Sequence, residues 1–118
     1  MVLLGLRLIE ENEWIRRTLR ARFPIIVIDE YQDLGLPLHR IVLNLLREGV
    51  RILAVGDPDQ SIYGFTGAKP ELLTELSEME GIESVRLPFN YRSGEKIVSA
   101  SQIVLGEKRG YKANTEAL

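Results

Sequence analysis

Residues 23–28 read FPIIVI and run directly into the acidic stretch DEYQD at residues 29–33. The pattern recurs where RILAV at 51–55 is followed by GDPDQ at 56–60. Short, β-branched apolar runs of this kind are typical of buried strands in a parallel sheet. Ligands of open α/β sheets bind beyond the carboxyl ends of the strands. We therefore expect one crevice to be lined by the polar residues that follow the two runs, which are Asp29, Glu30, Asp57 and Gln60.

A helix between the two runs would complete a βαβ unit over residues 24–56. The spacing predicts this helix over 37–48, with Pro37 in its first turn and Gly49 at its end. Its apolar face would consist of Leu38, Ile41, Val42, Leu45 and Leu46. Strand, helix and parallel strand in this order indicate an α/β fold, with the connection right-handed.

Further elements are expected on both sides of this unit. We predict one amphipathic helix over 3–21 with Trp14 in the core, and a helix over 70–80. A short strand should follow over 84–89, and then a helix over 94–106 with Ser93 as its N-cap.

Composition limits the classes of protein that the chain can represent. It has 118 residues, 45% of them hydrophobic and 27% charged, which is enough for one domain with a core. The net charge of −2 creates no strong overall attraction to nucleic acid, although a local basic groove remains compatible with it. The absence of cysteine excludes disulfides and thiolate metal sites. No run approaches the ~18 apolar residues of a membrane span, and residues 1–9 lack a signal-peptide layout, so we expect a cytoplasmic protein.

The acids after residue 28 suit nucleotide chemistry. Neighbouring carboxylates at a strand end, such as those of Asp29 and Glu30, point in different directions, so one can face Mg²⁺ while the other faces a water molecule, as phosphoryl transfer to water requires. The neutral amide of Gln60 could contact a γ-phosphate. The alternative is that the acids only solvate a strand end and that Gln60 is an ordinary loop residue.

Two further groups of residues each have a functional and a purely structural interpretation. Tyr63 and Phe65 could stack on nucleic-acid bases or could anchor their loop on the core. In the stretch 90–93, Arg92 offers a planar fork for phosphate oxygens and Tyr91 a ring for adenine, whereas the alternative is a helix N-cap beside a surface arginine. The single histidine, His39, has no partner at metal-binding spacing and receives no catalytic role.

Together these segments resemble the UvrD/Rep-like superfamily 1 DNA helicases. Residues 26–33 (IVIDEYQD) are similar to that family's motif II, the Walker B segment. Residues 55–68 (VGDPDQSIYGFTGA) resemble motif III, and residues 90–93 (NYRS) resemble motif IV. The order and spacing of the motifs also match, and the resemblance covers about residues 20–106.

The resemblance implies a fold and an activity. The fold would be a partial P-loop NTPase-like (RecA-like) parallel sheet flanked by helices. Residues 1–89 would be the C-terminal half of the first motor domain, and residues 90–118 the start of the second. The family couples ATP hydrolysis to 3′ to 5′ movement along single-stranded DNA.

The resemblance also implies roles for single residues. Asp29 would bind Mg²⁺, Glu30 would activate the attacking water, and Gln60 would contact the γ-phosphate and couple it to DNA. Tyr91 would stack on adenine and Arg92 would reach the γ-phosphate.

The DNA-binding residues implied by the resemblance are Tyr63 and Phe65, with Phe65 the better candidate for base stacking. Many family members carry arginine where this chain has Thr66, which puts one contact of the coupling loop in doubt. More importantly, the chain contains no G-x-x-x-x-G-K-[S/T] sequence, so the phosphate cradle and its lysine are absent from it. We therefore expect a fragment of a helicase motor that is inactive by itself.

Two other functions are compatible with parts of the sequence. The first is a binding or interaction module without catalysis, which self-associates or joins the missing helicase segments through an exposed sheet edge and apolar face. The second is a Mg²⁺-dependent nuclease or phosphatase that uses Asp29, Glu30, Asp57 and Asp59. The second reading leaves Gln60 and residues 90–93 unexplained.

Overall fold

The computed structural model describes residues 1–61, 67–106 and 110–113. The chain divides into two compact units, residues 1–82 and residues 83–118, and each unit is described here by itself. Both contain helices and a small parallel sheet, which confirms the predicted α/β class. The assignment of residues 1–89 and 90–118 to two motor domains stays a prediction.

The first unit is built around a βαβ unit. Strands β1 (Ile25–Ile28) and β2 (Arg51–Ala54) are parallel, in a register that pairs Ile25 with Arg51 and Ile28 with Ala54. Helix α3 (Leu36–Arg47) connects them, as predicted. The remaining elements of the unit are α1 (Val2–Glu11), α2 (Glu13–Arg22), the 3₁₀ turns η1 (Tyr31–Asp33) and η2 (Pro58–Gln60), and α4 (Glu71–Ser77).

Helix α3 forms where its sequence signals lie. Pro37 occupies the first turn, and Gly49, just beyond the C-cap, has a φ of +93° that favours glycine. The buried residues of the helix are His39, Val42 and Leu45. Leu38, which we placed on the apolar face, is exposed, and the neighbouring His39 is buried instead.

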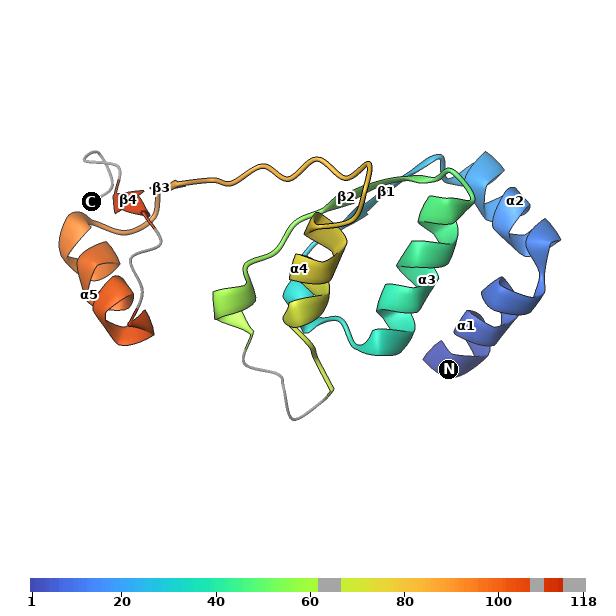
Figure 1. Ribbon diagram of the computed structural model, residues 1–118, viewed down its shortest axis with the longest axis horizontal. Helices are drawn as coiled ribbons and strands as arrows, with labels where there is room; N and C mark the ends of the chain where they lie inside the picture. The colour runs from blue at the N-terminus through green and yellow to red at the C-terminus, as the bar shows by residue number, and fades with distance from the viewer. Residues whose placement is uncertain (62–66, 107–109, 114–118) are drawn as a thin grey trace. The chain divides into compact units, whose positions relative to one another are not determined.

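The core lies between the sheet and two helices. Its buried cluster consists of Tyr31, Val42, Leu72 and Leu76, with Ile28, Ile52 and Ala54 of the strands among the half-buried residues packed against it. The helix predicted over 70–80 is therefore present as the shorter α4, with its expected leucines inward. Figure 1 shows α3 and α4 on the same side of the sheet.

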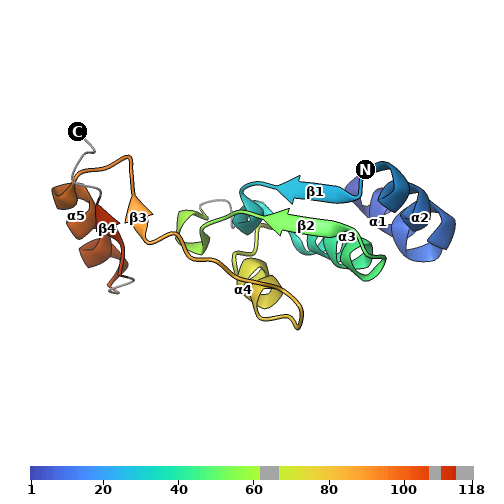
Figure 2. The same ribbon diagram turned by 90° about the horizontal axis from the view of Figure 1, so that it is seen from above.

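The opposite face of the sheet is uncovered. Figure 2 looks onto this face, and no described helix of the unit lies over the strands there. Because side chains alternate along a strand, every second residue is exposed, including Ile25 at 51%, Val27 at 64% and Leu53 at 56%. The prediction of fully buried strands is therefore wrong for this face, since the helices of the unit cover only the other one.

The predicted helix over 3–21 is interrupted. Asn12 adopts an extended conformation (φ −126°, ψ 100°) and separates α1 from α2. The guanidinium of Arg16 donates hydrogen bonds to the carbonyl oxygens of Ile9 and Glu10, at 2.7 and 3.2 Å. The break is stable because these bonds satisfy carbonyls that the end of α1 leaves without helical partners.

Trp14 does not belong to the core, contrary to the prediction. Its side chain is 67% exposed, and α2 buries none of its residues. In α1 the buried residue is Leu6, whereas Leu4 and Leu8 are exposed. Periodicity identified the amphipathic character of this segment, but it could not tell that packing of α1 on α3 buries Leu6 and leaves Leu4, Leu8 and Trp14 exposed.

The second unit contains β3 (Phe89–Asn90), α5 (Glu95–Leu105) and β4 (Lys112–Ala113), with β3 and β4 parallel. The strand predicted over 84–89 is therefore wrong except at its end: the carbonyl of Pro88 accepts the N–H of Lys112 in β4 at 2.8 Å and β3 begins at Phe89, whereas residues 84–87 belong to no described strand. The N-cap of α5 is Gly94 rather than Ser93, whose N–H donates to the side chain of Asn90 at 2.8 Å.

None of the described helices combines the length and the apolar character that crossing a membrane requires. The cytoplasmic location stays a prediction.

Candidate functional site

The acids after β1 lie on an unusual stretch of backbone. Glu30 has φ 51° and ψ 45°, which makes it the one described residue other than glycine with a positive φ. Its N–H donates to Oδ1 of Asp29 at 2.9 Å, and both carboxylates are exposed. A left-handed conformation outside glycine costs roughly 1–3 kcal/mol and is frequent at functional sites. This turn is therefore a candidate site on its backbone geometry as well as on its charge.

The polar residues after β2 form a compact turn of their own. Oδ1 of Asp57 accepts the N–H of Asp59 at 3.0 Å, which caps η2. Oδ2 of Asp57 accepts Nε2 of Gln60 at 2.8 Å, and the backbone N–H of Gln60 donates to the carbonyl of Asp57 at 3.0 Å. The side chain of Gln60 is exposed but held by this turn.

One glutamine joins the two turns. Nε2 of Gln32 donates to Oε2 of Glu30 at 2.7 Å, and Oε1 of Gln32 accepts the N–H of Asp57 at 3.0 Å. A chain of hydrogen bonds therefore runs from Glu30 through Gln32 and Asp57 to Gln60. The structure therefore brings together Glu30, Asp57 and Gln60 of the predicted crevice, and Asp29 directly precedes Glu30 in the chain.

Gln32 was missed by the sequence analysis, although it lies in the quoted motif. The sequence signal that could have found it is a glutamine two residues after the strand-end acid Glu30, because the amide of glutamine can donate one hydrogen bond and accept another. What the sequence could not supply was its partner Asp57, which is 25 residues away.

The turn after β1 is also fixed on its core side. Tyr31 is completely buried, and its hydroxyl lies 2.8 Å from Nδ1 of His39 on α3. Burial, followed by the charge of Glu75, raises the pKa of Tyr31 to about 12, so the phenol stays protonated and can donate to Nδ1. Burial lowers the pKa of His39 below its ordinary value, and the nearby Glu75 partly opposes this. His39 thus has a structural role beside the site, which the sequence did not indicate.

The residues present fit a magnesium ion held mainly by a nucleotide. The described residues contain no group of three potential metal ligands from histidine, cysteine, aspartate or glutamate. Mg²⁺ usually binds through one or two carboxylates, with phosphate oxygens and waters completing its shell. An exposed carboxylate such as that of Asp29 matches this mode, whereas a closed protein cage for the metal is not formed by the described residues.

Tyr91 and Arg92 belong to the second unit. Oδ1 of Asn90 accepts the N–H of Arg92 at 2.9 Å, which forms the turn between β3 and α5. The side chains of Tyr91 and Arg92 are exposed, and the ring of Tyr91 lies 6.3 Å from that of Phe89 between centroids. The candidate DNA-binding residues, Tyr63 and Phe65, lie outside the described residues, as does Thr66.

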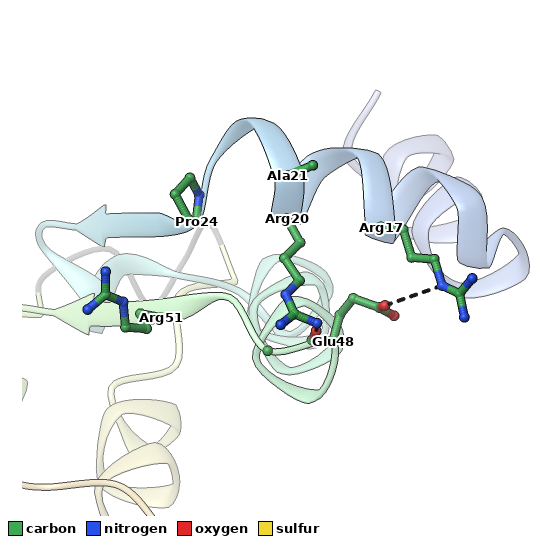
Figure 3. Close-up of a pocket in the computed structure, with 7 residues that line it drawn as sticks. Arg17, Arg20, Ala21, Pro24, Glu48 and Arg51 are labelled. Carbon is green, nitrogen blue, oxygen red and sulfur yellow. Dashed lines mark hydrogen bonds and ion pairs between the residues drawn. The ribbon is translucent and has the colours of Figure 1, made fainter.

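A hollow of the first unit lies at the other end of the strands. Its volume is about 770 Å³, and its lining includes Pro24, which precedes β1, and Arg51, which begins β2. Figure 3 shows the side chains of Arg17, Arg20 and Glu48 at this hollow. Because ligands of parallel sheets bind at carboxyl ends, the hollow is not the counterpart of the crevice predicted from the strand-end acids.

Comparisons with known proteins agree with the motifs. Residues 1–80 match the family model of the UvrD/REP helicase N-terminal domain. The chain is 33% identical to the ATP-dependent DNA helicase Rep of Escherichia coli over 130 residues, which covers 100% of this chain and 19% of Rep.

Two further relatives show the same relation. The chain is 37% identical to DNA helicase II of Escherichia coli over 92 residues, covering 77% of this chain and 13% of the helicase. It is 33% identical to the ATP-dependent DNA helicase UvrD2 of Mycobacterium bovis over 109 residues, covering 92% and 16%. The chain thus spans less than a fifth of the length of these relatives.

Proposed function

This chain belongs to the UvrD/REP helicase family, and we propose that it supplies the water-activating and γ-phosphate-sensing part of a motor that couples ATP hydrolysis to movement along single-stranded DNA. The observation that carries the proposal is the chain of hydrogen bonds from Glu30 through Gln32 and Asp57 to Gln60. It connects a candidate general base with a candidate nucleotide sensor.

The proposed division of work follows the charges of the site. Asp29 would hold Mg²⁺, which when bound neutralises charge on the β- and γ-phosphate oxygens. Glu30 would accept a proton from the water that attacks the γ-phosphate. Gln60 would donate its amide to a γ-phosphate oxygen, and its neutrality leaves the charge balance of the site unchanged.

Two groups outside this network complete the proposal. Tyr91 would stack on the adenine, and the fork of Arg92 would contact the γ-phosphate. Their exposed side chains support such contacts. Tyr63 and Phe65 would contact single-stranded DNA by stacking on its bases.

The test is a chimeric helicase in which this chain replaces the aligned segment of Escherichia coli Rep. We expect ATP hydrolysis that depends on single-stranded DNA and Mg²⁺. Glu30→Gln should lower kcat by roughly 10²–10⁴-fold, the contribution of a positioned general base. The matched control is Glu11→Gln, which removes an exposed partner of Arg7 and should leave kcat unchanged.

The chain alone should hydrolyse little or no ATP. Catalysis of phosphoryl transfer is mostly positioning and charge stabilisation, and the chain has no phosphate-cradle sequence to provide its share. Calorimetric titration of the chain with ATP and Mg²⁺ should accordingly detect no saturable binding. Saturable binding that is lost in the Arg92→Ala variant would be the contrary result. A folded chimera that hydrolyses ATP equally well with Glu30→Gln would contradict the proposed function.

A second candidate function is an interaction module, which the uncovered face of the β1–β2 sheet favours. Ile25, Val27 and Leu53 are exposed on this face, with Leu53 paired to Val27 in the neighbouring strand, and exposed apolar residues gathered in this way commonly mark interfaces. Self-association through this face predicts dimers or larger species in size-exclusion chromatography at micromolar concentration, and Val27→Lys should shift them towards monomer. A wild-type chain that elutes as a monomer would count against this candidate.

A further inference from the structure

We propose that Gln32 is a positioning residue, whose side-chain amide fixes the Glu30 carboxylate relative to Asp57 and Gln60. The inference rests on the proposed function, since it concerns how the candidate general base and the candidate phosphate sensor are held together. Gln32 itself need not touch nucleotide.

The hydrogen bonds of Gln32 use both ends of its amide. The nitrogen donates to the Glu30 carboxylate at 2.7 Å, and the oxygen accepts the Asp57 N–H at 3.0 Å. The residue is only 1% exposed, so water cannot replace these partners. Breaking either contact would leave a buried polar atom unsatisfied, and this cost favours one orientation of the side chain.

No other residue type of this length provides the same pair of bonds. Glutamate could accept from Asp57 but would repel the carboxylate of Glu30, and methionine could do neither. The amide also carries no charge, so it can bridge to an acid without neutralising the charge that Mg²⁺ requires nearby.

The backbone around Gln32 places the amide between the two turns. The N–H of Tyr31 donates to the carbonyl of Val55 at 3.0 Å, which extends the contact between the strands beyond β1. A Cβ on Gly56 would lie 2.6 Å from Oε1 of Gln32 and 3.1 Å from the nitrogen of Tyr31. Glycine at this position therefore permits the approach that the bridge needs.

The bridge gives Gln60 a route to Glu30. Gln60 is tied to the side chain of Asp57, whose N–H is tied to Gln32, which in turn holds Glu30. A displacement of Gln60 on contact with a phosphate would therefore be transmitted to the exposed carboxylate of Glu30. Gln32 is thus the side chain that hydrogen-bonds to both turns, in addition to the backbone bond between Tyr31 and Val55.

A double-mutant cycle on the intact 118-residue chain, followed by NMR, tests this relay without ATP. Glu30→Ala should shift the resonances of the Gln60 side-chain amide and the Asp57 backbone amide by more than their linewidths. In a Gln32→Met background, Glu30→Ala should leave both resonances unshifted. The matched control is Gln102→Met, which removes another half-buried glutamine bond, to the carbonyl of Tyr111, and should leave the response to Glu30→Ala intact.

Two more variants test the bridge. Gln32→Glu separates the two hydrogen bonds of Gln32, and Gly56→Ala disturbs the bridge without changing Gln32. Gln32→Glu keeps the acceptor for Asp57, so hydrogen exchange of the Asp57 amide should stay slow, whereas Gln32→Met should accelerate it by about tenfold. Gly56→Ala should displace the Gln32 amide and reproduce the effect of Gln32→Met with Gln32 itself unchanged.

The outcomes distinguish this inference from the proposed function. Equal resonance shifts in the wild-type and Gln32→Met backgrounds, or no shift in either, would overturn the relay. An inactive chimera together with a Gln32-dependent shift would instead overturn the proposed function and leave the bridge between the turns in place.

Discussion

The charged residues at the two ends of strands β1 and β2 differ in their partners. At the amino ends, Glu48 has a side chain only 17% exposed and lies 3.2 Å from Arg16 and 4.0 Å from Arg17. Arg20 donates to the carbonyl of Glu48 at 3.0 Å, next to the end of α3. At the carboxyl ends, no ion pair among the described residues involves Asp29, Glu30 or Asp57, whose described partners are amide groups.

The difference separates a structural end from a candidate chemical end. The ion pairs of Glu48 with Arg16 and Arg17 join α2 to the end of α3, beside the hollow of Figure 3. Acids held only by neutral groups keep their charge available for a cation. The presence of a hollow is therefore a poorer guide to the site than the pairing of the charges around it.

The largest effect on stability is expected at the amino ends. Arg16→Ala would remove the 3.2 Å contact with Glu48 and the bonds to the carbonyls of Ile9 and Glu10. We expect a loss of roughly 1.5–3 kcal/mol in the free energy of unfolding, measured by urea denaturation, because hydrogen bonds of charged groups are the stronger ones. The control, Arg7→Ala, breaks an exposed pair with Glu11 and should cost only about 0.3–0.5 kcal/mol. Equal losses of stability in Arg16→Ala and Arg7→Ala would contradict a special structural role for the charges at the amino ends.

An intermediate effect is expected from pH at the carboxyl ends, through His39. Its pKa is lowered in the folded chain, so between that pKa and the unfolded value of about 6.5 the unfolded chain binds more protons. Stability should therefore fall as pH drops below about 6.5, with a slope of at most roughly 1.4 kcal/mol per pH unit from this group. Chemical denaturation at several pH values measures it.

The control for this pH dependence is His39→Gln, which removes the titrating ring. Its stability should change less than that of the wild type between pH 6.5 and 5, even if it is lower at neutral pH. Parallel curves for the two proteins would mean that the burial of His39 does not control acid stability.

The smallest effect is expected for the acids themselves. Glu30→Gln keeps an acceptor for Gln32, and Asp29→Asn keeps an acceptor for the N–H of Glu30, so each should change stability by no more than about 0.5 kcal/mol. Thermal unfolding of both variants beside Glu48→Gln checks this. A larger loss at Asp29 or Glu30 than at Glu48 would reverse the comparison of the two ends.

The sequence by itself determined the parts that depend on neighbouring residues. The strands at Ile25–Ile28 and Arg51–Ala54, the helix between them and its end near Gly49 follow from local periodicity, β-branching and glycine. The order of the motifs identified the family before any contact was known. These features could be predicted because the interactions that produce them lie within a few residues along the chain.

Only the tertiary structure decided how distant residues combine. The bridge from Gln32 to Asp57, the buried pair of Tyr31 and His39, and the exposure of Trp14 each depend on what packs against a residue from elsewhere in the chain. A hydrophobic pattern states that a face is suited to burial, but burial also needs a partner surface. The same limit applies to polar groups, since the donor and the acceptor of a buried bond are brought together by the fold and not by their spacing in the sequence.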